Sequence, residues 1–252
     1  MQKYALILGI TSDMALAFAK KLAKENYNLY LAGRNKKEIE KIAKDLQIRY
    51  NITTIPIEID LEKVDPKFLN SLKKQFTQPF EIFANFAGYL GNQKEAQETP
   101  EEISRIININ YVKVVLLTEE VVSLMLNWFK NNLVTKPTIL GVSSVAGDRG
   151  RQSNYFYGSA KAGYTTYLSG LRNRLFKEKI HVITVKPGFV YTKMTSNMNL
   201  PKLLTAQPEE VAEDIFKAVQ RKTNILYTKW FWRYIMLIIR LIPEAVFKKL
   251  NL

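Results

Sequence analysis

Short, nearly continuous apolar runs alternate along the chain with longer stretches of helical periodicity. Strands that helices cover on both faces have such runs, because neither face meets water. The pattern predicts about seven strands of one parallel sheet. They are expected at Tyr4–Leu8, Leu29–Ala32, Ile55–Ile59, Ile82–Phe86, Thr138–Val142, Val182–Val185 and Asn224–Tyr227.

Helical patterns fill the intervals between these runs. Residues Ala15–Glu25 and Lys36–Arg49 are the clearest helices. The Thr-Pro-Glu-Glu sequence at 99–102 predicts a capping box that opens a long helix, and Gln-Pro-Glu-Glu at 207–210 predicts another helix start. Strands and helices that alternate in this way indicate an α/β fold. We expect a doubly wound parallel sheet with helices on both faces and a ligand at the carboxyl ends of its strands.

An apolar and basic segment at residues 229–252 follows the domain expected at residues 1–228. Residues Trp230–Ile242 are mostly aromatic and aliphatic, but Arg233 and Arg240 interrupt them, and the run is short for a membrane span. An apolar helix of this kind fits a membrane–water interface. Packing on the domain or across a dimer interface is the alternative.

The chain is strongly basic. It has 252 residues and a net charge of +14, from 37 Lys and Arg against 23 Asp and Glu. Such a charge attracts nucleic acid, acidic lipid headgroups or phosphorylated substrates. The basic residues are spread along the sequence without a nucleic-acid-binding motif, so we expect no nucleic-acid partner. Cysteine is absent, which excludes disulfides and thiolate metal sites, and we expect no metal.

Tyr157 and Lys161 are one helical turn apart, so both side chains can face one site. The pKa of free tyrosine lies near about 10. A fixed cation nearby favours the phenolate and lowers that pKa, and we expect Tyr157 to exchange a proton with a carbonyl oxygen near neutral pH. Because this spacing is common, an ordinary amphipathic helix is the alternative.

A dinucleotide is expected where the first strand turns into the first helix. Gly9 permits a tight turn, Ala15 is small enough for close packing, and the amides at the helix start can hold a pyrophosphate. Asp13 adds a negative charge beside that phosphate, which is unfavourable unless its side chain points away. A plain strand-to-helix turn is the alternative.

In chain order, these features resemble the short-chain dehydrogenase/reductase family over nearly the whole chain. The matching motifs are the turn at 9–15, Asp60-Leu61, Asn-Phe-Ala-Gly at 85–88, Asn110, Ser144, Tyr157 with Lys161, and Pro187-Gly188 followed by Thr192. The resemblance implies a Rossmann-like fold and an oxidoreductase that uses a nicotinamide cofactor. The cofactor-binding residues it implies are Gly9, Thr11, Ser12, Met14, Arg34, Asp60, Leu61, Asn85, Ala87, Gly88, Tyr157, Lys161, Pro187, Gly188, Val190 and Thr192.

The resemblance also implies four catalytic residues. Ser144 and Tyr157 would donate hydrogen bonds to the substrate oxygen as it gains negative charge, and Tyr157 would give the proton. Lys161 would lower the pKa of Tyr157 and hold the nicotinamide ribose, and Asn110 would relay protons through water. A helix cap or kink is the alternative role for Asn110, and a strand-end hydrogen bond is the alternative for Ser144.

The end of the second strand indicates which cofactor is used. A free ribose 2′-hydroxyl favours an acidic residue here, whereas a 2′-phosphate favours an arginine. Arg34 is in place and no acid is near, so we predict NADP(H) in preference to NAD(H). A solvated loop cation is the alternative for Arg34.

The residues at 144–151 and 231–243 narrow the resemblance to reductases of a decaprenylphosphoryl 2-keto-pentose. The reaction this implies is the second half of a 2′-epimerisation in cell-envelope biosynthesis, after a partner flavin oxidase has made the ketone. Arg149 and Arg151 would then contact the lipid phosphate, with solvated loop charge as the alternative.

Other substrates and roles stay open, because one scaffold serves many reactions. One alternative is a reductase of another membrane lipid ketone, such as a 3-oxoacyl, steroid or sphingoid compound. Another is a non-catalytic NADP(H)-binding or membrane-surface interaction protein. The apolar run after Lys3 lacks a signal-peptide pattern, so we expect a cytoplasmic protein, peripheral at the inner face of the membrane. Members of the family often form dimers or tetramers through their long helices, so a homodimer or homotetramer is one expectation, which the apolar tail could either assist or block.

Overall fold

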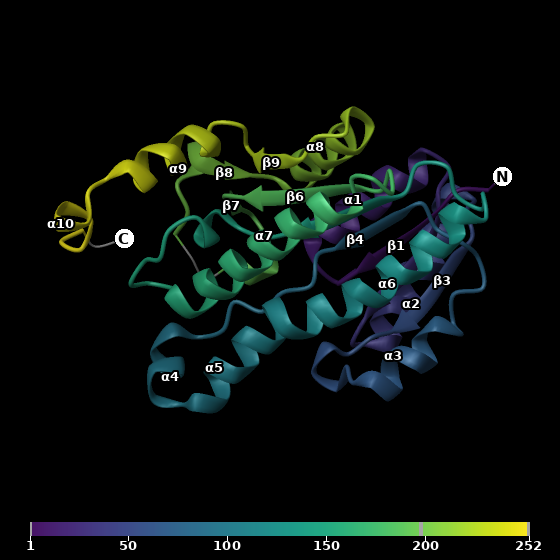
Figure 1. The fold of residues 1–252 in the computed structure, drawn as a ribbon, viewed down its shortest axis with the longest axis horizontal. Coiled ribbons are helices and arrows are strands. Elements are labelled where there is room, and N and C mark those ends of the chain that lie inside the picture. Colours follow the sequence, from purple (N-terminus) through teal and green to yellow (C-terminus); the bar gives the residue numbers. More distant parts are fainter. Residues whose placement is uncertain (1, 197–198, 251–252) are drawn as a thin grey trace.

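Seven parallel strands form the centre of the protein. The computed structural model describes residues 2–196 and 199–250. The strands are β1 (Tyr4–Leu8), β2 (Asn28–Gly33), β3 (Thr54–Glu58), β4 (Ile82–Asn85), β5 (Thr138–Val142), β6 (His181–Pro187) and β9 (Ile225–Thr228). They form one sheet in the order β3-β2-β1-β4-β5-β6-β9 (Figure 1). All seven predicted strands are confirmed, with ends that differ by at most two residues.

Helices cover both faces of the sheet, as the apolar strands require. On one face lie α1 (Asp13–Lys24), α2 (Lys36–Tyr50) and α8 (Pro208–Arg221), which bury Phe18, Ile39 and Ile215 against the strands. On the other face lie α3 (Pro66–Lys73), α6 (Lys113–Lys130) and α7 (Tyr155–Leu175). The fold is therefore the predicted doubly wound, Rossmann-like sheet.

The long helix expected after residue 99 is interrupted. It runs as α5 (Pro100–Ile107), a π-helical turn (Asn108–Val112) and α6, and the short α4 (Gln93–Glu98) precedes it. The capping box predicted at 99–102 is wrong, since Thr99 makes no side-chain cap hydrogen bond. The carboxylate of Glu102 instead accepts hydrogen bonds from the Tyr89 hydroxyl and the Asn92 N–H. The helix start predicted at 207–210 is confirmed, since α8 begins at Pro208 and the Gln207 N–H donates to the Glu210 carboxylate at 2.7 Å.

The sheet topology fixes the position of the site. Strand β1 pairs with β2 on one side and with β4 on the other. The strand order therefore reverses at β1: the chain first builds the sheet outward through β2 and β3, and then continues on the other side of β1 from β4 onward. Leu8 lies opposite Ala32 and Asn85, and the turns that follow these three strands therefore meet at one edge. Ligands bind at such switch points in open α/β sheets.

Two further pairs of elements lie beside this edge. Strands β7 (Phe189–Val190) and β8 (Thr205–Ala206) form a small parallel pair. Helices α9 (Trp232–Leu241) and α10 (Glu244–Phe247) extend beyond the sheet (Figure 1). The inner side of α9 is anchored, because Trp232 and Met236 are buried together with Val145. Among the described helices, none is both long enough and apolar enough to cross a bilayer.

Candidate active site

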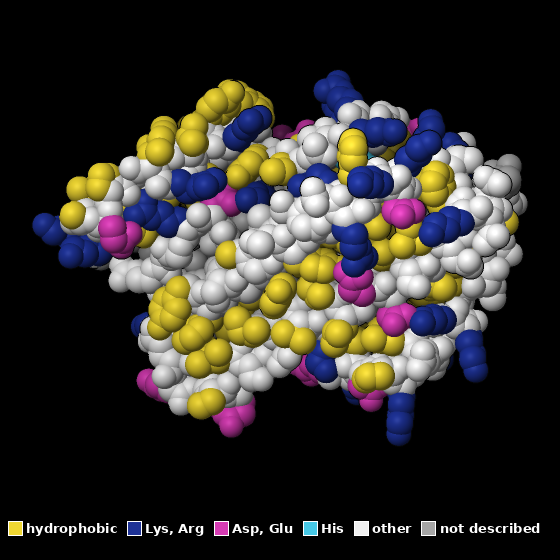
Figure 2. All heavy atoms as spheres, viewed as in Figure 1, with side chains coloured by type: hydrophobic (Ala, Val, Ile, Leu, Met, Phe, Trp, Pro, Cys, Tyr) yellow, Lys and Arg dark blue, Asp and Glu magenta, His cyan; other side chains and the backbone are white. Residues whose placement is uncertain are grey.

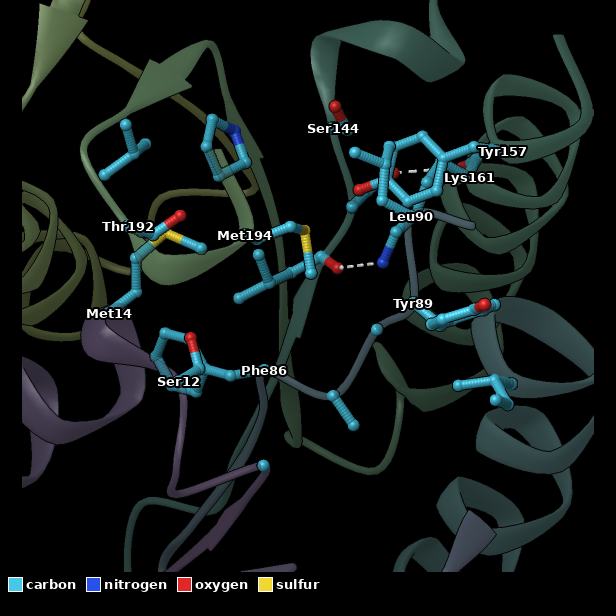
Figure 3. Close-up of a pocket in the computed structure, with 18 of the residues that line it drawn as sticks. Ser12, Met14, Phe86, Tyr89, Leu90, Ser144, Tyr157, Lys161, Thr192 and Met194 are labelled. Atoms are coloured by element: carbon cyan, nitrogen blue, oxygen red, sulfur yellow. Dashed lines mark hydrogen bonds between the residues drawn. The ribbon is translucent and has the colours of Figure 1, made fainter. Parts of the chain in front are cut away.

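A cavity of about 340 Å³ opens at the carboxyl ends of the strands. Ser144, Tyr157 and Lys161 lie along one side of it, whereas Ser12 and Met14 lie opposite, with Thr192 and Met194 near them (Figure 3). The cavity lining contains Gly9, Thr11, Ser12, Met14, Arg34, Asp60, Leu61, Ala87, Gly88, Ser144, Arg151, Tyr157, Lys161, Pro187, Gly188, Val190 and Thr192. Asn85, Asn110 and Arg149 are not part of it. The structure thus brings most of the predicted residues together.

Helix α7 carries Tyr157 and Lys161 toward the end of β5. The Lys161 ammonium is buried, donates to the Val142 carbonyl oxygen at 3.1 Å and lies 5.6 Å from the centroid of the Tyr157 ring. Ser144 lies just beyond β5, where its hydroxyl accepts a hydrogen bond from the Ala146 N–H at 3.1 Å. The neighbouring Ser143 is bound instead to α7, through the Lys161 carbonyl oxygen and the Thr165 hydroxyl.

Burial is the main cause of the pKa shifts of Tyr157 and Lys161. It raises the pKa of Tyr157 to about 12, although a hydrogen bond with Ser144 acts in the lowering direction. Burial also lowers the pKa of Lys161 to about 8. The expected lowering of the Tyr157 pKa by Lys161 is therefore not observed, because desolvation of the phenolate outweighs the other effects. Near neutral pH, Tyr157 is a protonated phenol beside a largely protonated lysine.

Asn110 is at the π-helical turn and lies behind the cavity wall. Its Nδ2 donates to the carbonyl oxygens of Tyr89 and Ile106 at 2.6 and 2.8 Å, and its Oδ1 accepts from Tyr89 N–H at 3.1 Å. A Cβ added at Gly88 would lie 3.2 Å from that Oδ1 and 3.3 Å from Lys161 Nζ. Asn110 thus fixes the backbone that follows β4, next to Lys161.

Gly9 and Asn85 shape the floor of the cavity. Gly9 has a φ of +82°, and a Cβ there would lie 2.7 Å from the Ala87 backbone nitrogen. Asn85 is fully buried and donates to the Tyr164 hydroxyl at 3.0 Å, while its Oδ1 accepts from Ala87 N–H. Asn85 therefore positions the chain that a ligand would meet.

Asp13 points away from the start of α1. Its carboxylate accepts a hydrogen bond from the Lys193 backbone N–H at 2.7 Å, across the mouth of the cavity. The Asp13 carboxylate, expected to be unfavourable beside a phosphate, thus bonds to the Lys193 backbone instead. Ser12, the N-cap of α1, makes no side-chain cap hydrogen bond.

The residues fit a dinucleotide. The turn at Gly9 allows close approach, and the start of α1 offers N–H donors for a pyrophosphate. Arg34 is exposed at the end of β2 and lines the same cavity, as a partner for a ribose phosphate. Asp60 accepts from Glu62 N–H at 3.1 Å and caps the short helix that begins at Leu61.

The structure separates the two loop arginines. Arg149 lies outside the cavity wall and caps α9: its guanidinium donates to the Ile242 carbonyl oxygen at 2.7 Å and to Glu244 at 2.9 Å, and it lies 3.6 Å from the Phe247 ring centroid. These contacts occupy the Arg149 guanidinium, so the predicted contact of Arg149 with a substrate phosphate is not supported. Arg151 does line the cavity, and its Nε is buried without a hydrogen-bond partner.

Sequence reasoning missed a buried polar cluster behind this loop. Asp148 pairs with Lys186 of β6 and accepts a hydrogen bond from the Tyr227 hydroxyl at 2.9 Å. The cluster ties the loop before α7 to β6 and β9. Nothing local in the sequence indicates it, because the three residues lie far apart along the chain.

Comparisons with known proteins agree with this geometry. Residues 3–202 match the sequence family described as short chain dehydrogenase. An uncharacterized oxidoreductase of Mycobacterium tuberculosis is 32% identical over 163 residues, which are 65% of this chain and 63% of that protein. The chain thus covers less than two thirds of that relative's length. An NADP-dependent 3-hydroxy acid dehydrogenase of Schizosaccharomyces pombe is 28% identical over 89% of both chains. A short-chain dehydrogenase from Sphingobium yanoikuyae, solved in complex with NADPH, has a TM-score of 0.79 at 20% identity and covers 96% of this chain and 97% of its own.

Proposed function

The chain belongs to the short-chain dehydrogenase family, and we propose that it is an NADP(H)-dependent reductase that converts a ketone to an alcohol. The observation that carries this proposal is the protonated Tyr157 phenol, with Ser144 and the Lys161 ammonium beside it in one cavity. A reductase needs a proton donor at the carbonyl oxygen, and a phenol with a raised pKa remains a donor at neutral pH.

The chemistry of these side chains is complementary. The nicotinamide supplies the hydride when bound. The Ser144 and Tyr157 hydroxyls donate to the substrate oxygen, and Tyr157 then gives up its proton. The ammonium of Lys161 favours the phenolate that results. Asn110 acts as a positioning residue through the Tyr89 backbone and the packing at Gly88.

Arg34 supports NADP(H) over NAD(H). It is exposed at the cavity, where a 2′-phosphate would gain charge-assisted hydrogen bonds. The yeast relative is named as NADP-dependent, and the Sphingobium protein is described with NADPH.

For the substrate, we favour the 2-keto sugar of a polyprenyl-phosphoryl pentose. Two features support this choice: Arg151 in the cavity wall, and the apolar, basic helix α9, which Arg149 of the same loop contacts. In this proposal a flavin oxidase first makes the ketone, and this enzyme then reduces it to an alcohol, as a step in cell-envelope biosynthesis. A 3-oxoacyl, steroid or sphingoid ketone of the membrane is the second candidate, favoured by the exposed apolar side chains of α9.

We propose peripheral contact with the cytoplasmic face of a membrane through α9. Ile238 and Leu241 are 65% and 72% exposed, and Arg233 and Arg240 belong to the same helix. Figure 2 shows apolar and basic side chains close together over α9 and α10. Such a surface matches an anionic lipid layer. A homodimer or homotetramer is compatible with the proposal.

The decisive experiment is NADPH oxidation by the purified protein in detergent or vesicles. The substrates are a polyprenyl-phosphoryl 2-keto-pentose, a 3-oxoacyl ketone and a steroid ketone, each assayed with wild type and Tyr157→Phe. Turnover of the sugar lipid alone supports the first choice, and turnover of another ketone replaces it. NADPH binding without turnover of any ketone would assign the chain to the non-catalytic alternative.

A further inference from the structure

The turn before α7 contains a cation, Arg151, that forms no ion pair with any carboxylate in the described part of the chain. The Arg151 side chain is half-buried, its Nε is buried without a hydrogen-bond partner, and it lines the same cavity as Tyr157. Desolvation lowers the pKa of Arg151, and no carboxylate opposes this shift. A guanidinium stays charged at neutral pH, and leaving it desolvated and unpaired is unfavourable. An anionic ligand would remove that cost.

A second unpaired group belongs to the same turn. Asn154 N–H donates to the Arg151 carbonyl oxygen at 3.1 Å, which places both residues directly before α7. Asn154 is the N-cap of α7, yet its side chain makes no cap hydrogen bond, and its Oδ1 is buried without a partner among residues 2–196 and 199–250. Asparagine at this position usually bonds to the first turn of its own helix. Here the acceptor is left for another donor, and Asn154 also lines the cavity.

We propose that Arg151 and Asn154 form a substrate subsite that binds an oxyanion and an adjacent hydroxyl of the ketone reduced at Tyr157. This inference rests on the proposed reductase function and adds a selectivity for anionic, hydroxylated ketones over neutral, apolar ones. Arginine and an oxyanion form short, charge-assisted hydrogen bonds, and the asparagine oxygen accepts from a hydroxyl. A phosphoryl group and a carboxylate both supply the oxyanion.

The subsite is distinct from the residues that fit the cofactor phosphates. Arg34 lies at the end of β2, and the N–H groups for a pyrophosphate lie at the start of α1. Arg151 lies three strands away from β2 in the sheet order, on the loop between β5 and α7 that also carries Ser144. Because Arg151 lines the cavity that also holds the Tyr157 proton donor, its position points to the substrate.

The first test compares three small ketones at saturating NADPH: hydroxyacetone phosphate, acetoacetate and neutral hydroxyacetone. We expect Arg151→Met to lower kcat/KM for the anionic ketones by about 10- to 100-fold, the worth of one or two hydrogen bonds to a charged group. The value for hydroxyacetone should change little, and Arg151→Lys should recover part of the loss. Arg221→Met, an exposed arginine of α8, is the matched control. The two anionic ketones distinguish a phosphate-specific from a carboxylate-specific subsite.

A second test does not require turnover. Inorganic phosphate and acetate are titrated into the NADPH complex, and the shift in Tm is recorded for wild type, Arg151→Met and Asn154→Ala. A shift that Arg151→Met abolishes supports the subsite even if no ketone is reduced, in which case only the reductase proposal fails. Equal losses on anionic and neutral ketones, equal Tm shifts in wild type and Arg151→Met, or a weaker NADPH affinity in Arg151→Met would each overturn the inference.

Discussion

The indole ring of Trp232 lies directly against Gly188, so closely that a Cβ added at Gly188 would fall 2.0 Å from ring atoms Cε2 and Nε1. Trp232 Nε1 donates to the Leu204 carbonyl oxygen at 3.2 Å, and the Phe189 ring meets the indole edge-on at 5.2 Å. Gly188 follows the last residue of β6 and lines the cavity, and Trp232 is the first residue of α9. Through Trp232, helix α9 is therefore packed against the wall of the cavity.

This packing predicts the effect of adding one methyl group. Gly188→Ala should lower the free energy of unfolding by about 1–3 kcal/mol, the usual cost of overpacking, and weaken NADPH binding because the cavity wall must move. Chemical denaturation and fluorescence titration with NADPH measure the two effects. Gly150→Ala is the control, since a Cβ there meets nothing within 4 Å. Equal stability of both variants would contradict the close contact.

Loss of the Tyr157 hydroxyl should affect chemistry and leave binding intact. Tyr157→Phe removes the proton donor, and we expect kcat to fall by about 10²- to 10⁴-fold with little change in NADPH affinity. Tyr155→Phe is the matched control on the same helix, because its hydroxyl only accepts a hydrogen bond from Gln97. Steady-state kinetics with the best ketone decide the matter, and a Tyr157→Phe variant with near wild-type kcat would remove Tyr157 from the proposed mechanism.

The strands could be predicted because they depend on local patterns, whereas most site residues were expected only from the family resemblance. An apolar run such as Tyr4–Leu8 indicates a buried strand by itself, and its parallel neighbours bring Gly9 and Gly88 to one edge. Tyr157 and Lys161 share a helical face wherever that helix lies. The strand and the shared helical face follow from periodicity alone, whereas the meeting of Gly9 and Gly88 also needs the pairing of β1 with β4.

Other features depend on residues that are distant in sequence. Arg149 is expected at a substrate phosphate but caps α9, and Asp13 bonds to the Lys193 backbone. The pKa of Tyr157 is set by the depth of its burial, which the spacing to Lys161 does not reveal. No local pattern encodes these three outcomes, because each arises only when the complete chain has packed.

The preference for NADP(H) predicts that loss of Arg34 lowers the affinity for NADPH and not that for NADH. Arg34→Ala should weaken NADPH binding by about 10- to 100-fold, because it removes charge-assisted hydrogen bonds to the 2′-phosphate. NADH lacks this phosphate, so its affinity should stay close to that of wild type. Parallel titrations with both cofactors measure the ratio, and an equal loss for NADH would assign Arg34 to another role.

The pKa of Lys161 predicts an alkaline limit for ketone reduction. Burial lowers this pKa to about 8, so the ammonium is present below that pH and lost as the pH rises through it. Tyr157 keeps its proton throughout this range, because its pKa is about 12. We expect kcat/KM for reduction to fall above about pH 8, where Lys161 loses its charge while Tyr157 keeps its proton. A profile that stays flat well above that pH would show that the Lys161 charge is not needed.

Membrane contact through α9 should be separable from folding. Removing the whole tail would also remove Trp232 and Met236 from the core, so substitutions on its outer side are the sharper test. We expect Ile238→Glu with Leu241→Glu to reduce co-sedimentation with anionic phospholipid vesicles at least about tenfold, since each side chain loses roughly 1.5–3 kcal/mol of apolar burial. The Tm should change little, because both residues are exposed. Ile48→Glu on α2, 73% exposed in wild type, is the matched control. Unchanged sedimentation of the double variant would contradict membrane contact through α9, because its exposed apolar side chains would then not bind lipid. A protein partner for this surface would be the remaining explanation.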